Sequence, residues 1–258
     1  MNVKLLAHTQ LVEDIFLIDK TGNLDWETPH ERWNCTDGQT IALTAIRTCY
    51  SHLEPSEIVE TEAGKYFGKA ASDGKGGTDA DRLMRHIINS GHTSTLEHLT
   101  YTFAIEGVSR SLLAQITRHR HFSFSVQSQR YNKLESDSKS GGFDHVVPDS
   151  VENCKKRISI FDDFSHSARD VYNEAMEHIQ QAYDTLREAG VPAEDARFVL
   201  PNAATCNLVL TGNLRSFLDF HIKRSAKGAQ WEIRELSDLI KNAIVEVEPW
   251  TENFFITG

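Results

Sequence analysis

The sequence predicts an α+β fold that is mostly helical and has a small sheet of the antiparallel type. Several long segments repeat apolar residues every three or four positions, as amphipathic helices do. Two short segments, 99–105 and 205–210, have strand character instead. The chain has 258 residues, of which 40% are hydrophobic and 25% charged, and this suits a globular protein with a sizeable core. We therefore expect residues 1–258 to form a single domain.

The N-terminal half shows two helices and one strand. Residues 39–50 are expected to be helical, because their apolar side chains share one face. A second helix begins at Thr78, which is a good cap and is followed by acidic residues, and it ends at Gly91. Residues 99–105 alternate with a period of two, which predicts a half-buried strand.

The C-terminal half is predicted to be dominated by one long helix over residues 163–189, which Gly190 and Pro192 end. Its expected buried stripe consists of Ala168, Tyr172, Ala175, Ile179, Ala182 and Leu186. The further elements expected are a short helix from residue 192, a strand over 205–210, and helices over 214–225 and 229–247.

Two stretches, about 51–77 and about 135–150, are rich in glycine, serine and charged residues and are predicted to be loop insertions. The first contains Asp73-Gly74-Lys75-Gly76-Gly77. This run lacks the spacing of a phosphate-binding P-loop, and no apolar strand precedes it.

Composition excludes several classes of function. The formal charge of −10 argues against binding bulk nucleic acid or an anionic membrane. No apolar run is long enough to span a membrane, and no secretory signal is recognised at the N-terminus. The four cysteines are far apart, so we expect a reducing, cytoplasmic location without a zinc site or redox pair.

The most informative segment is 118–131, which packs three arginines, two histidines, three serines and two glutamines into fourteen positions. No acidic residue occurs between Glu106 and Glu135. The segment follows a predicted helix over 109–119, whose Gln115, Arg118 and His119 share one polar face. Guanidinium, hydroxyl and amide groups together suit phosphate and the polar edges of a heterocycle. A nucleotide or phosphate-bearing cofactor is the expected ligand.

Two other polar clusters accompany this segment. Residues 92–98 contain two histidines, but their spacing is not that of a zinc-binding helix, so a loop against a cofactor or a structural turn is favoured over a metal site. The second cluster comprises Arg197, Asn213, Arg215 and Arg224. Lys223 belongs to the same cluster. A solvated basic face is one explanation of it, but the apolar residues around Arg197 predict partial burial and hence a need for an anion.

The three clusters together resemble the flavin-dependent thymidylate synthase family. The family's hallmark is Arg-His-Arg followed after seven residues by Ser, and here Arg118-His119-Arg120 is followed after seven residues by Ser128. The resemblance extends to 45–50, 91–98, 191–201 and 229–233, and it covers about residues 37 to 250 without the two insertions.

The resemblance implies reductive methylation of dUMP to dTMP. 5,10-Methylenetetrahydrofolate would donate the carbon, FAD would carry the hydride, and NADPH would supply it. It also implies a homotetramer whose active sites draw residues from several chains, so that Arg197 would reach the dUMP bound in a neighbouring subunit.

Roles carried over from the family divide the residues into two groups. Those expected to bind FAD are Cys49, His92, Ser94, Glu97, Arg118, His119, Arg120, Asn213, Arg215 and Asp219. Those expected to bind dUMP are Gln115, Arg118, Val126, Gln127, Ser128, Gln129, Arg130, Arg197 and Arg224. Arg224 is the expected catalytic residue, because a fixed positive charge on a uracil carbonyl would stabilise the negative charge that develops there.

No residue is recognised as a covalent nucleophile. None of the four cysteines follows a proline, as the nucleophile of the cysteine-dependent thymidylate synthases does, and Ser128 has no neighbouring base. That cysteine-dependent class is one alternative. The other is a non-catalytic module that binds nucleotide or phosphate, which would need only the arginine clusters.

Three positions depart from the family pattern. Val126 stands where Glu or Gln is usual, so one polar contact to the nucleotide would be lost or made by the backbone. Asp219 stands where Asn or His is common, and its carboxylate would repel an FAD phosphate unless a cation offsets it. Gly228 replaces a histidine.

Overall fold

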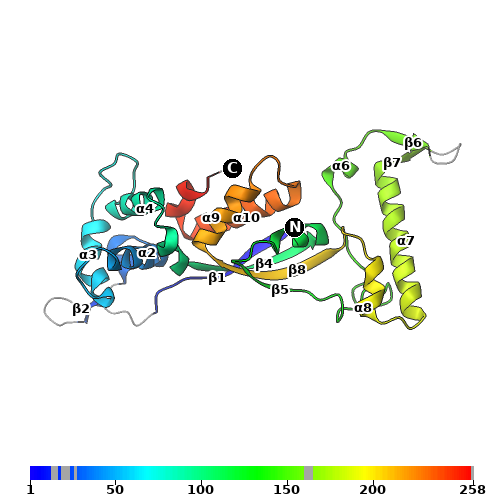
Figure 1. Cartoon of the computed structure of the whole chain (residues 1–258), viewed down its shortest axis with the longest axis horizontal. Coiled ribbons are helices and arrows are strands. Elements are labelled where there is room, and N and C mark those ends of the chain that lie inside the picture. The colour runs from blue at the N-terminus through cyan, green and yellow to red at the C-terminus, as the bar shows by residue number, and fades with distance from the viewer. Residues whose placement is uncertain (13–16, 19–23, 26–27, 160–164, 257–258) are drawn as a thin grey trace. The chain divides into compact units, whose positions relative to one another are not determined.

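The computed structural model describes residues 1–12, 17–18, 24–25, 28–159 and 165–256, and its secondary structure is of the α+β class (Figure 1). The chain divides into two compact units. Unit 1 comprises residues 1–2, 105–119 and 124–209, and unit 2 comprises residues 3–104, 120–123 and 210–258. No helix within the described ranges is both long enough and apolar enough to cross a membrane.

A four-stranded sheet has the order β1-β4-β8-β5, with bounds Asn2–His8, Thr100–Ser109, Thr205–Asn213 and Ser123–Val126. Strands β1 and β4 are antiparallel, because Asn2 bonds Glu106 in unit 1 whereas Thr9 bonds Thr100 in unit 2. The small antiparallel sheet expected from the sequence is confirmed, and both strands that were predicted extend further than the prediction.

Burial alternates along the two central strands, as a half-buried sheet requires. In β8 the even-numbered residues from Cys206 to Gly212 are buried, whereas Asn207 and Val209 are exposed. In β4 the buried positions alternate over Tyr101, Phe103 and Ile105, and Val108 and Ser109 at the end of the strand are buried as well. The polar side chains of β8 are therefore presented on the face opposite to the core.

Unit 2 contains most of the helices. Their bounds are Pro29–Trp33 (α1), Asp37–Thr48 (α2), Ile58–Tyr66 (α3), Asp79–Asn89 (α4), Leu214–Arg224 (α9) and Trp231–Val247 (α10). Short 3-10 helices lie at Pro55–Glu57, Thr93–His98 and Pro249–Phe254. Two strands of two residues each, β2 (Leu17–Ile18) and β3 (Leu24–Asp25), pair with one another.

Caps set the helix starts in the way the sequence suggested. Thr78 accepts a hydrogen bond from the Asp81 N–H and Thr36 accepts one from the Gln39 N–H, each within a reciprocal capping box. Gly91 follows α4 with a φ of 80°, a conformation that glycine adopts readily. The helices predicted at 39–50, after Thr78, at 214–225 and at 229–247 are confirmed with shifts of a few residues at their ends.

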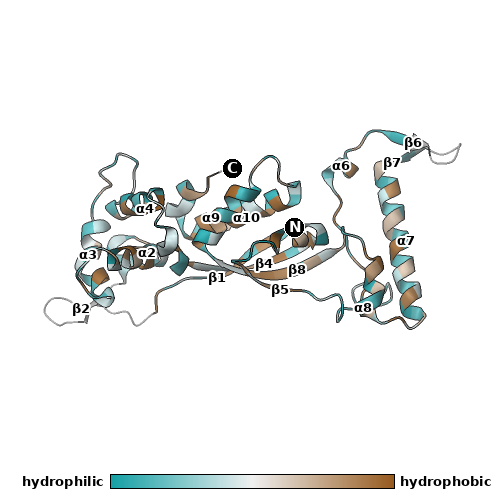
Figure 2. Cartoon of the chain, viewed as in Figure 1, coloured by the Kyte–Doolittle hydropathy of each residue, from teal (hydrophilic) through white to brown (hydrophobic). Residues whose placement is uncertain are grey.

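Unit 1 is built around the 21-residue helix α7, Ala168–Glu188. Its other elements are α5 (Arg110–Ile116), α6 (Asp149–Glu152), α8 (Ala193–Ala196), a 3-10 turn at Arg197–Val199, and the paired strands β6 (Arg157–Ser159) and β7 (Ser165–Ser167). Brown and teal bands alternate along α7 (Figure 2), consistent with an amphipathic helix.

Several predictions for this region were wrong. The long helix begins at Ala168 and not at 163, because residues 165–167 pair with β6 and Ser167 caps the helix; residues 160–164 lie outside the described part of the chain. The buried side chains of α7 are Met176 and Tyr183, whereas Ala175 and Ala182 are exposed. These alanines fit the helical period of the predicted stripe, but they lie on the solvent-exposed face of the helix.

Four other elements were not predicted. Strand β1 and helix α1 occupy the N-terminal region, and helix α3 lies within the stretch 51–77 that was expected to be a loop. Strand β5 lies inside the arginine-rich segment. The second expected loop, 135–150, is irregular apart from the start of the short helix α6.

Candidate functional site

The arginine-rich segment, 118–131, begins just after α5 and contains the edge strand β5. Its first residues prolong the helix as turns, since Arg118 N–H bonds Gln115 O and His119 N–H bonds Ile116 O at 3.0 Å. Arg118 and His119 belong to unit 1, and Arg120 belongs to unit 2. Arg118 and Arg120 are exposed. The motif therefore presents its guanidinium groups to solvent and does not use them to hold the core.

In unit 1 the residues after β5 form a tight turn. The Ser128 hydroxyl accepts the Arg130 N–H at 3.1 Å, and the Ser128 carbonyl accepts the Asn132 side-chain N–H at 2.7 Å. Half-buried Val126 ends the strand. The turn thus holds Ser128 and Arg130 in one local arrangement, with the Ser128 hydroxyl already engaged as an acceptor and still able to donate its proton.

Asn207 of β8 fixes the orientation of the Gln127 carboxamide. The Gly107 N–H can only donate, and it donates to Asn207 Oδ1 at 2.9 Å. The other end of the Asn207 amide is therefore its NH₂ group, which donates to Gln127 Oε1 at 3.0 Å. Gln127 N–H also donates to Asn207 O at 2.8 Å. This network leaves Gln127 Nε2 as a donor available to a ligand.

A cavity of about 410 Å³ lies beside this network. Uncharged polar groups line most of it, among them Gln127, Ser128, Gln129, Asn132 and Asn207. Its size falls in the range of small-molecule sites. Three residues predicted to bind the nucleotide therefore converge on one cavity of unit 1, with Asn132 and Asn207 as neighbours that the sequence did not single out.

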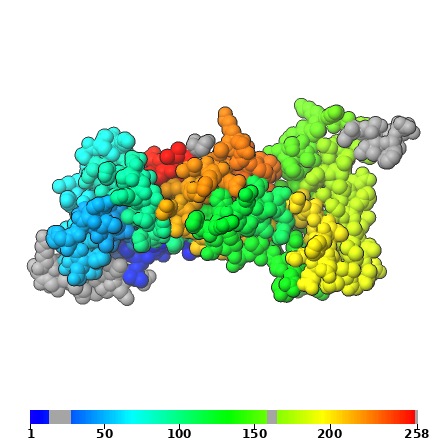
Figure 3. Space-filling view, viewed as in Figure 1, coloured from blue at the N-terminus to red at the C-terminus, as the bar shows by residue number. Residues whose placement is uncertain are grey.

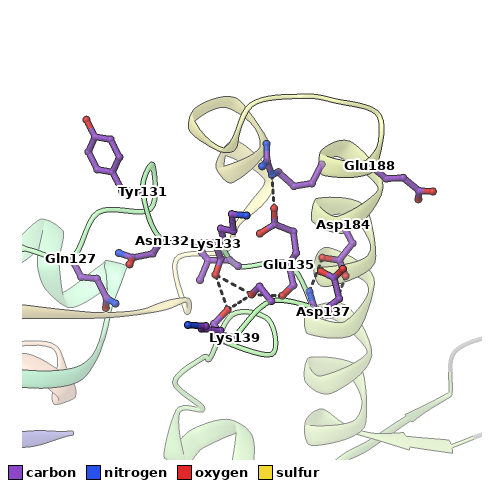
Figure 4. Close-up of a pocket in the computed structure, with 14 residues that line it drawn as sticks. Gln127, Tyr131, Asn132, Lys133, Glu135, Asp137, Lys139, Asp184 and Glu188 are labelled. Carbon is purple, nitrogen blue, oxygen red and sulfur yellow. Dashed lines mark hydrogen bonds and ion pairs between the residues drawn. The ribbon is translucent and has the colours of Figure 1, made fainter.

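A larger and more open hollow of about 1230 Å³ lies next to it in unit 1 (Figure 4). Residues of the 131–140 loop form one side and Asp184, Arg187 and Glu188 of α7 form the other. Arg187 Nε bonds Glu135 at 2.9 Å, and the Ser136 N–H bonds Asp184 at 3.1 Å, so the loop is attached to α7. These bonds hold the start of the predicted insertion at 135–150 against α7.

Arg130 and Arg197 both contact Glu194. Arg130 forms an ion pair with the Glu194 carboxylate at 2.9 Å, with both side chains about half exposed, and Arg197 Nε donates to the Glu194 carbonyl at 3.0 Å. Arg197 also lines a small cavity of about 260 Å³ with Gln129 and Arg110. Sequence reasoning missed Arg110, although it lies on the first turn of the helix that carries Gln115.

The partial burial expected for Arg197 is confirmed, and its cavity is also lined by Phe198, Leu200 and Pro201. Phe198 is 82% exposed and Val199 is 37% exposed, so these side chains do not cover the guanidinium. Arg197 itself is half-buried.

In unit 2 a second cluster joins the ends of α2 and α9 to the 3-10 turn at 93–98. Arg215 forms an ion pair with Glu97, and the Tyr50 hydroxyl lies 2.8 Å from His92 Nδ1. Cys49 caps the C-terminus of α2 beside Tyr50, and Ser94 is exposed on the turn. Cys49, His92, Ser94, Glu97 and Arg215 thus all belong to unit 2, as does Tyr50, whereas Arg118 and His119, also expected to bind FAD, belong to unit 1.

Asn213 and Asp219 each have a local partner on α9. Asn213 Oδ1 caps the helix by accepting from the Ser216 N–H at 2.9 Å, which leaves its NH₂ group for a ligand. Lys223 Nζ lies 2.6 Å from Asp219 Oδ2, one helical turn away. The lysine therefore offsets the negative charge of Asp219.

Arg224 is the last residue of α9 and is half-buried. The helix is held by Phe217 and Phe220, which are fully buried, and by His221 Nδ1, which lies 2.9 Å from the Ser237 hydroxyl of α10. Burial lowers the pKa of His221, so its imidazole is neutral near pH 7. The loop 225–230 that follows Arg224 projects from the surface as an orange protrusion (Figure 3).

The four cysteines differ in exposure. Cys35 and Cys206 are buried, and burial raises the pKa of the Cys35 thiol. Cys49 and Cys154 are exposed. Within the described ranges, no group of three or more His, Cys, Asp or Glu side chains is arranged to hold a metal ion.

The chain matches the sequence model of the family described as thymidylate synthase complementing protein (Thy1) over residues 33–250. Among curated proteins, it is 37% identical over 213 residues to a flavin-dependent thymidylate synthase of Geobacter sulfurreducens, covering 83% of this chain and 80% of the relative. It is also 37% identical over 255 residues to the enzyme of that name from Mycolicibacterium vanbaalenii, covering 96% of this chain and 87% of the relative.

A solved structure shares the fold. The UMP/dUMP methylase PolB from Streptomyces cacaoi, crystallised with 5-Br dUMP, superposes with a TM-score of 0.66 at 20% identity. The match covers 98% of this chain and 94% of that one.

Proposed function

The chain belongs to the flavin-dependent thymidylate synthase family and is an enzyme of that activity, and we propose that its two clusters bind the two partners of the reaction. The turn at 127–130 in unit 1 binds dUMP, and the cluster around Glu97, Asn213 and Arg215 in unit 2 binds FAD. The observation that carries the first assignment is the convergence of Gln127, Ser128 and Gln129 on one cavity beside Arg130, which is lined mainly by uncharged polar groups and by one carboxylate, Asp144.

The donor groups of unit 2 suit FAD. Arg120 and Arg215 are exposed cations, and the Asn213 NH₂ group is left free by the helix cap. These groups match the anionic pyrophosphate of the cofactor, and a helix N-terminus adds a favourable dipole. When bound, the flavin would carry the hydride that NADPH supplies, and 5,10-methylenetetrahydrofolate would supply the carbon.

The dUMP phosphate is assigned to Arg130, the Ser128 hydroxyl and Gln127 Nε2. All three offer donors, and Arg130 would exchange Glu194 for the phosphate. Val126 adds no side-chain donor or acceptor here. Gln115 and Arg118, which lie at the end of α5, remain assigned to the nucleotide, as do Gln129 and Arg197.

Arg224 is proposed to activate the uracil. Carbon 5 of uracil is a weak nucleophile, and a cation held against a ring carbonyl would stabilise the negative charge that forms during its attack. The Ser128 hydroxyl accepts a backbone N–H, and Cys35 and Cys206 are buried. The residues of this chain therefore act by binding, alignment and fixed charge.

A homotetramer is also proposed, with Arg197 reaching a neighbouring subunit's nucleotide. Two large side chains next to the assigned residues support it. Phe198 is 82% exposed and Tyr131 is 80% exposed, and apolar groups of this size at a binding site are typical of surfaces that another chain covers.

The test is tritium release from 5-tritiated dUMP, with FAD, NADPH and the folate each omitted in turn. The purified enzyme should show a flavin spectrum. Release and dTMP formation should require NADPH and the folate, and after the bound flavin has been removed they should also require added FAD. Undiminished dTMP formation without a flavin would contradict the proposal, and so would a trapped covalent adduct between a side chain and the substrate.

A further inference from the structure

Gly212 of β8 leaves room for one aromatic ring. It is buried, and a Cβ atom built on it would lie 2.6 Å from Cε1 of Phe122 and 3.2 Å from Cε2 of Phe217. Contacts of 2.6 Å between carbon atoms do not occur in packed proteins, because well-packed carbons stay about 3.5–4.0 Å apart. Any larger residue at 212 would therefore displace the Phe122 ring.

Phe122 fills that space as part of an aromatic cluster in unit 2. Its ring centroid lies 4.8 Å from that of Phe217 and 5.7 Å from that of Phe220, and both partners are fully buried residues of α9. Phe217 in turn contacts Phe103 of β4 at 5.4 Å. Such offset and edge-on pairs define the position of a ring more sharply than aliphatic contacts do.

Phe122 is the anchor of the chain around it. It is only 7% exposed, whereas Arg120, His121 and Ser123 are all exposed. Of the unit 2 residues 120–123, Phe122 is the one whose side chain is buried, and Ser123 begins strand β5, which pairs with β8. The position of Arg120, two residues before it, depends on where the phenyl ring sits.

The same contacts fix the other assigned flavin ligands. Gly212 directly precedes Asn213, and Phe217 and Phe220 lie on the helix whose first turn carries Arg215. Arg215 is held further by its ion pair with Glu97. The ring of Phe122 therefore sets the separation between Arg120 on one side and Asn213 and Arg215 on the other.

We propose that Phe122 and Gly212 form a matched large–small pair that positions Arg120 relative to the N-terminus of α9 for flavin binding. This inference rests on the proposed assignment of FAD to that cluster. Neither residue contacts the cofactor in this account: both act through Arg120 and Asn213, whose donors must reach the cofactor's phosphates together.

The test is a set of size-compensating variants. Gly212→Ala, Phe122→Leu and the double variant are compared with wild type by FAD fluorescence titration and by thermal unfolding without FAD. Gly212→Ala should weaken FAD binding about tenfold or more, because small misplacements of binding groups are costly. Phe122→Leu should also weaken it. The double variant, in which the smaller side chain makes room for the new methyl group, should recover most of the lost affinity.

Gly64→Ala is the matched control. Gly64 lies on α3 of the same unit, and a Cβ there would meet Trp33 at an ordinary 3.7 Å. Its FAD affinity should equal that of wild type. If Gly212→Ala does not fold, Phe122→Leu and the double variant still decide the question, since only the double variant should approach wild-type affinity.

Two results would overturn the inference alone. One is wild-type FAD affinity in both single variants. The other is a double variant that recovers its melting temperature but not its affinity, which would mean that the pair serves packing only. A wild-type protein that binds no FAD would overturn the proposed flavin assignment and the inference with it.

Discussion

Asn207 and Gln127 are joined amide to amide, with Asn207 Nδ2 donating to Gln127 Oε1 at 3.0 Å. The backbone of Gly107 settles the direction of this bond, because its N–H occupies Asn207 Oδ1. A residue on the exposed face of β8 thereby decides that Gln127 presents a donor to the proposed nucleotide site. The end of the Gln127 amide that faces the proposed site is thus set by strand β8, which was not expected to contribute to nucleotide binding.

Asn207→Asp should reverse that polarity. The new carboxylate cannot donate to Gln127 Oε1, so the Gln127 amide would turn and present an acceptor to dUMP. We expect KM for dUMP to rise about tenfold, since a mispaired polar contact costs roughly 1–3 kcal/mol, whereas FAD affinity stays unchanged.

A charge control separates this effect from simple repulsion. Thr205→Asp places a carboxylate on the same strand and the same cavity without touching the amide pair. Steady-state kinetics should show a clearly smaller rise in KM for this variant. Equal rises in both variants would mean that added charge, and not amide orientation, governs binding.

Glu194→Gln should tighten dUMP binding. In the ligand-free chain Glu194 pairs with Arg130, and a phosphate must replace it. Because half-exposed ion pairs are worth only about 0.2–1 kcal/mol, the gain should not exceed about fivefold in Kd. Isothermal titration at low salt measures it, and Asp195→Asn, which removes the adjacent exposed carboxylate, is the control. Weaker binding in Glu194→Gln would show that Glu194 aids the nucleotide.

The fold could be predicted where local patterns and packing agree. The helix at 79–89 has a capping residue, acids in its first turn and a glycine after its end, and it formed as expected. The helix start at 163 failed, because Ser165–Ser167 pairs with Arg157–Ser159, and such pairing depends on residues that are not neighbours in sequence. Strand β1 was not predicted for the same reason, since the strand it pairs with is about 100 residues away in sequence.

The residues of the candidate site could be predicted from the sequence, but the residues that hold them in position could not. The arginine-rich segment was found from the absence of acids and the density of donors. The roles of Asn207, Glu194 and Phe122 were not, because a carboxamide, a carboxylate and a phenyl ring carry no local signal of what they contact. The sequence alone does not explain why residue 212 is glycine. The Phe122 ring explains it, because a Cβ atom at 212 would collide with that ring.

Glu62 should make unit 2 sensitive to acid. It bonds Arg47 at 2.5 Å, and this contact lowers the pKa of the Glu62 carboxyl below its ordinary value of 4.5. A lowered pKa in the folded state contributes stability above about pH 4.5, and this contribution is lost as pH falls through the folded-state pKa.

The comparison with Glu62→Gln measures this contribution. Urea unfolding at pH 7 should show wild type more stable by about 1–3 kcal/mol, and the difference should shrink steadily below pH 4.5. Glu60→Gln, an exposed acid on the same helix, serves as the control and should show little change at either pH. A difference that stays constant down to pH 3 would mean that the Glu62 pKa is not lowered.

Replacing each cysteine singly by alanine should leave dTMP formation largely intact. Cys35 and Cys206 are buried and Cys49 and Cys154 are exposed, and no thiol is assigned to the reacting carbon. Buried positions need a stability check, so turnover is normalised to folded protein by circular dichroism. Loss of turnover in one correctly folded variant would favour a cysteine-dependent mechanism.

Arg224→Ala should separate binding from chemistry. Arg224 ends α9, while the assigned flavin groups lie at the opposite end of that helix, so FAD should remain bound. Methylation should fall by about 10²-fold or more, because the variant loses the fixed charge proposed to stabilise the activated uracil. Stopped-flow flavin reduction and single-turnover dTMP formation distinguish the two steps. Lys227→Ala removes a cation from the exposed loop just beyond and should leave both unchanged. Normal turnover in Arg224→Ala would assign the activating charge to another residue, and Arg118 would be the next to replace.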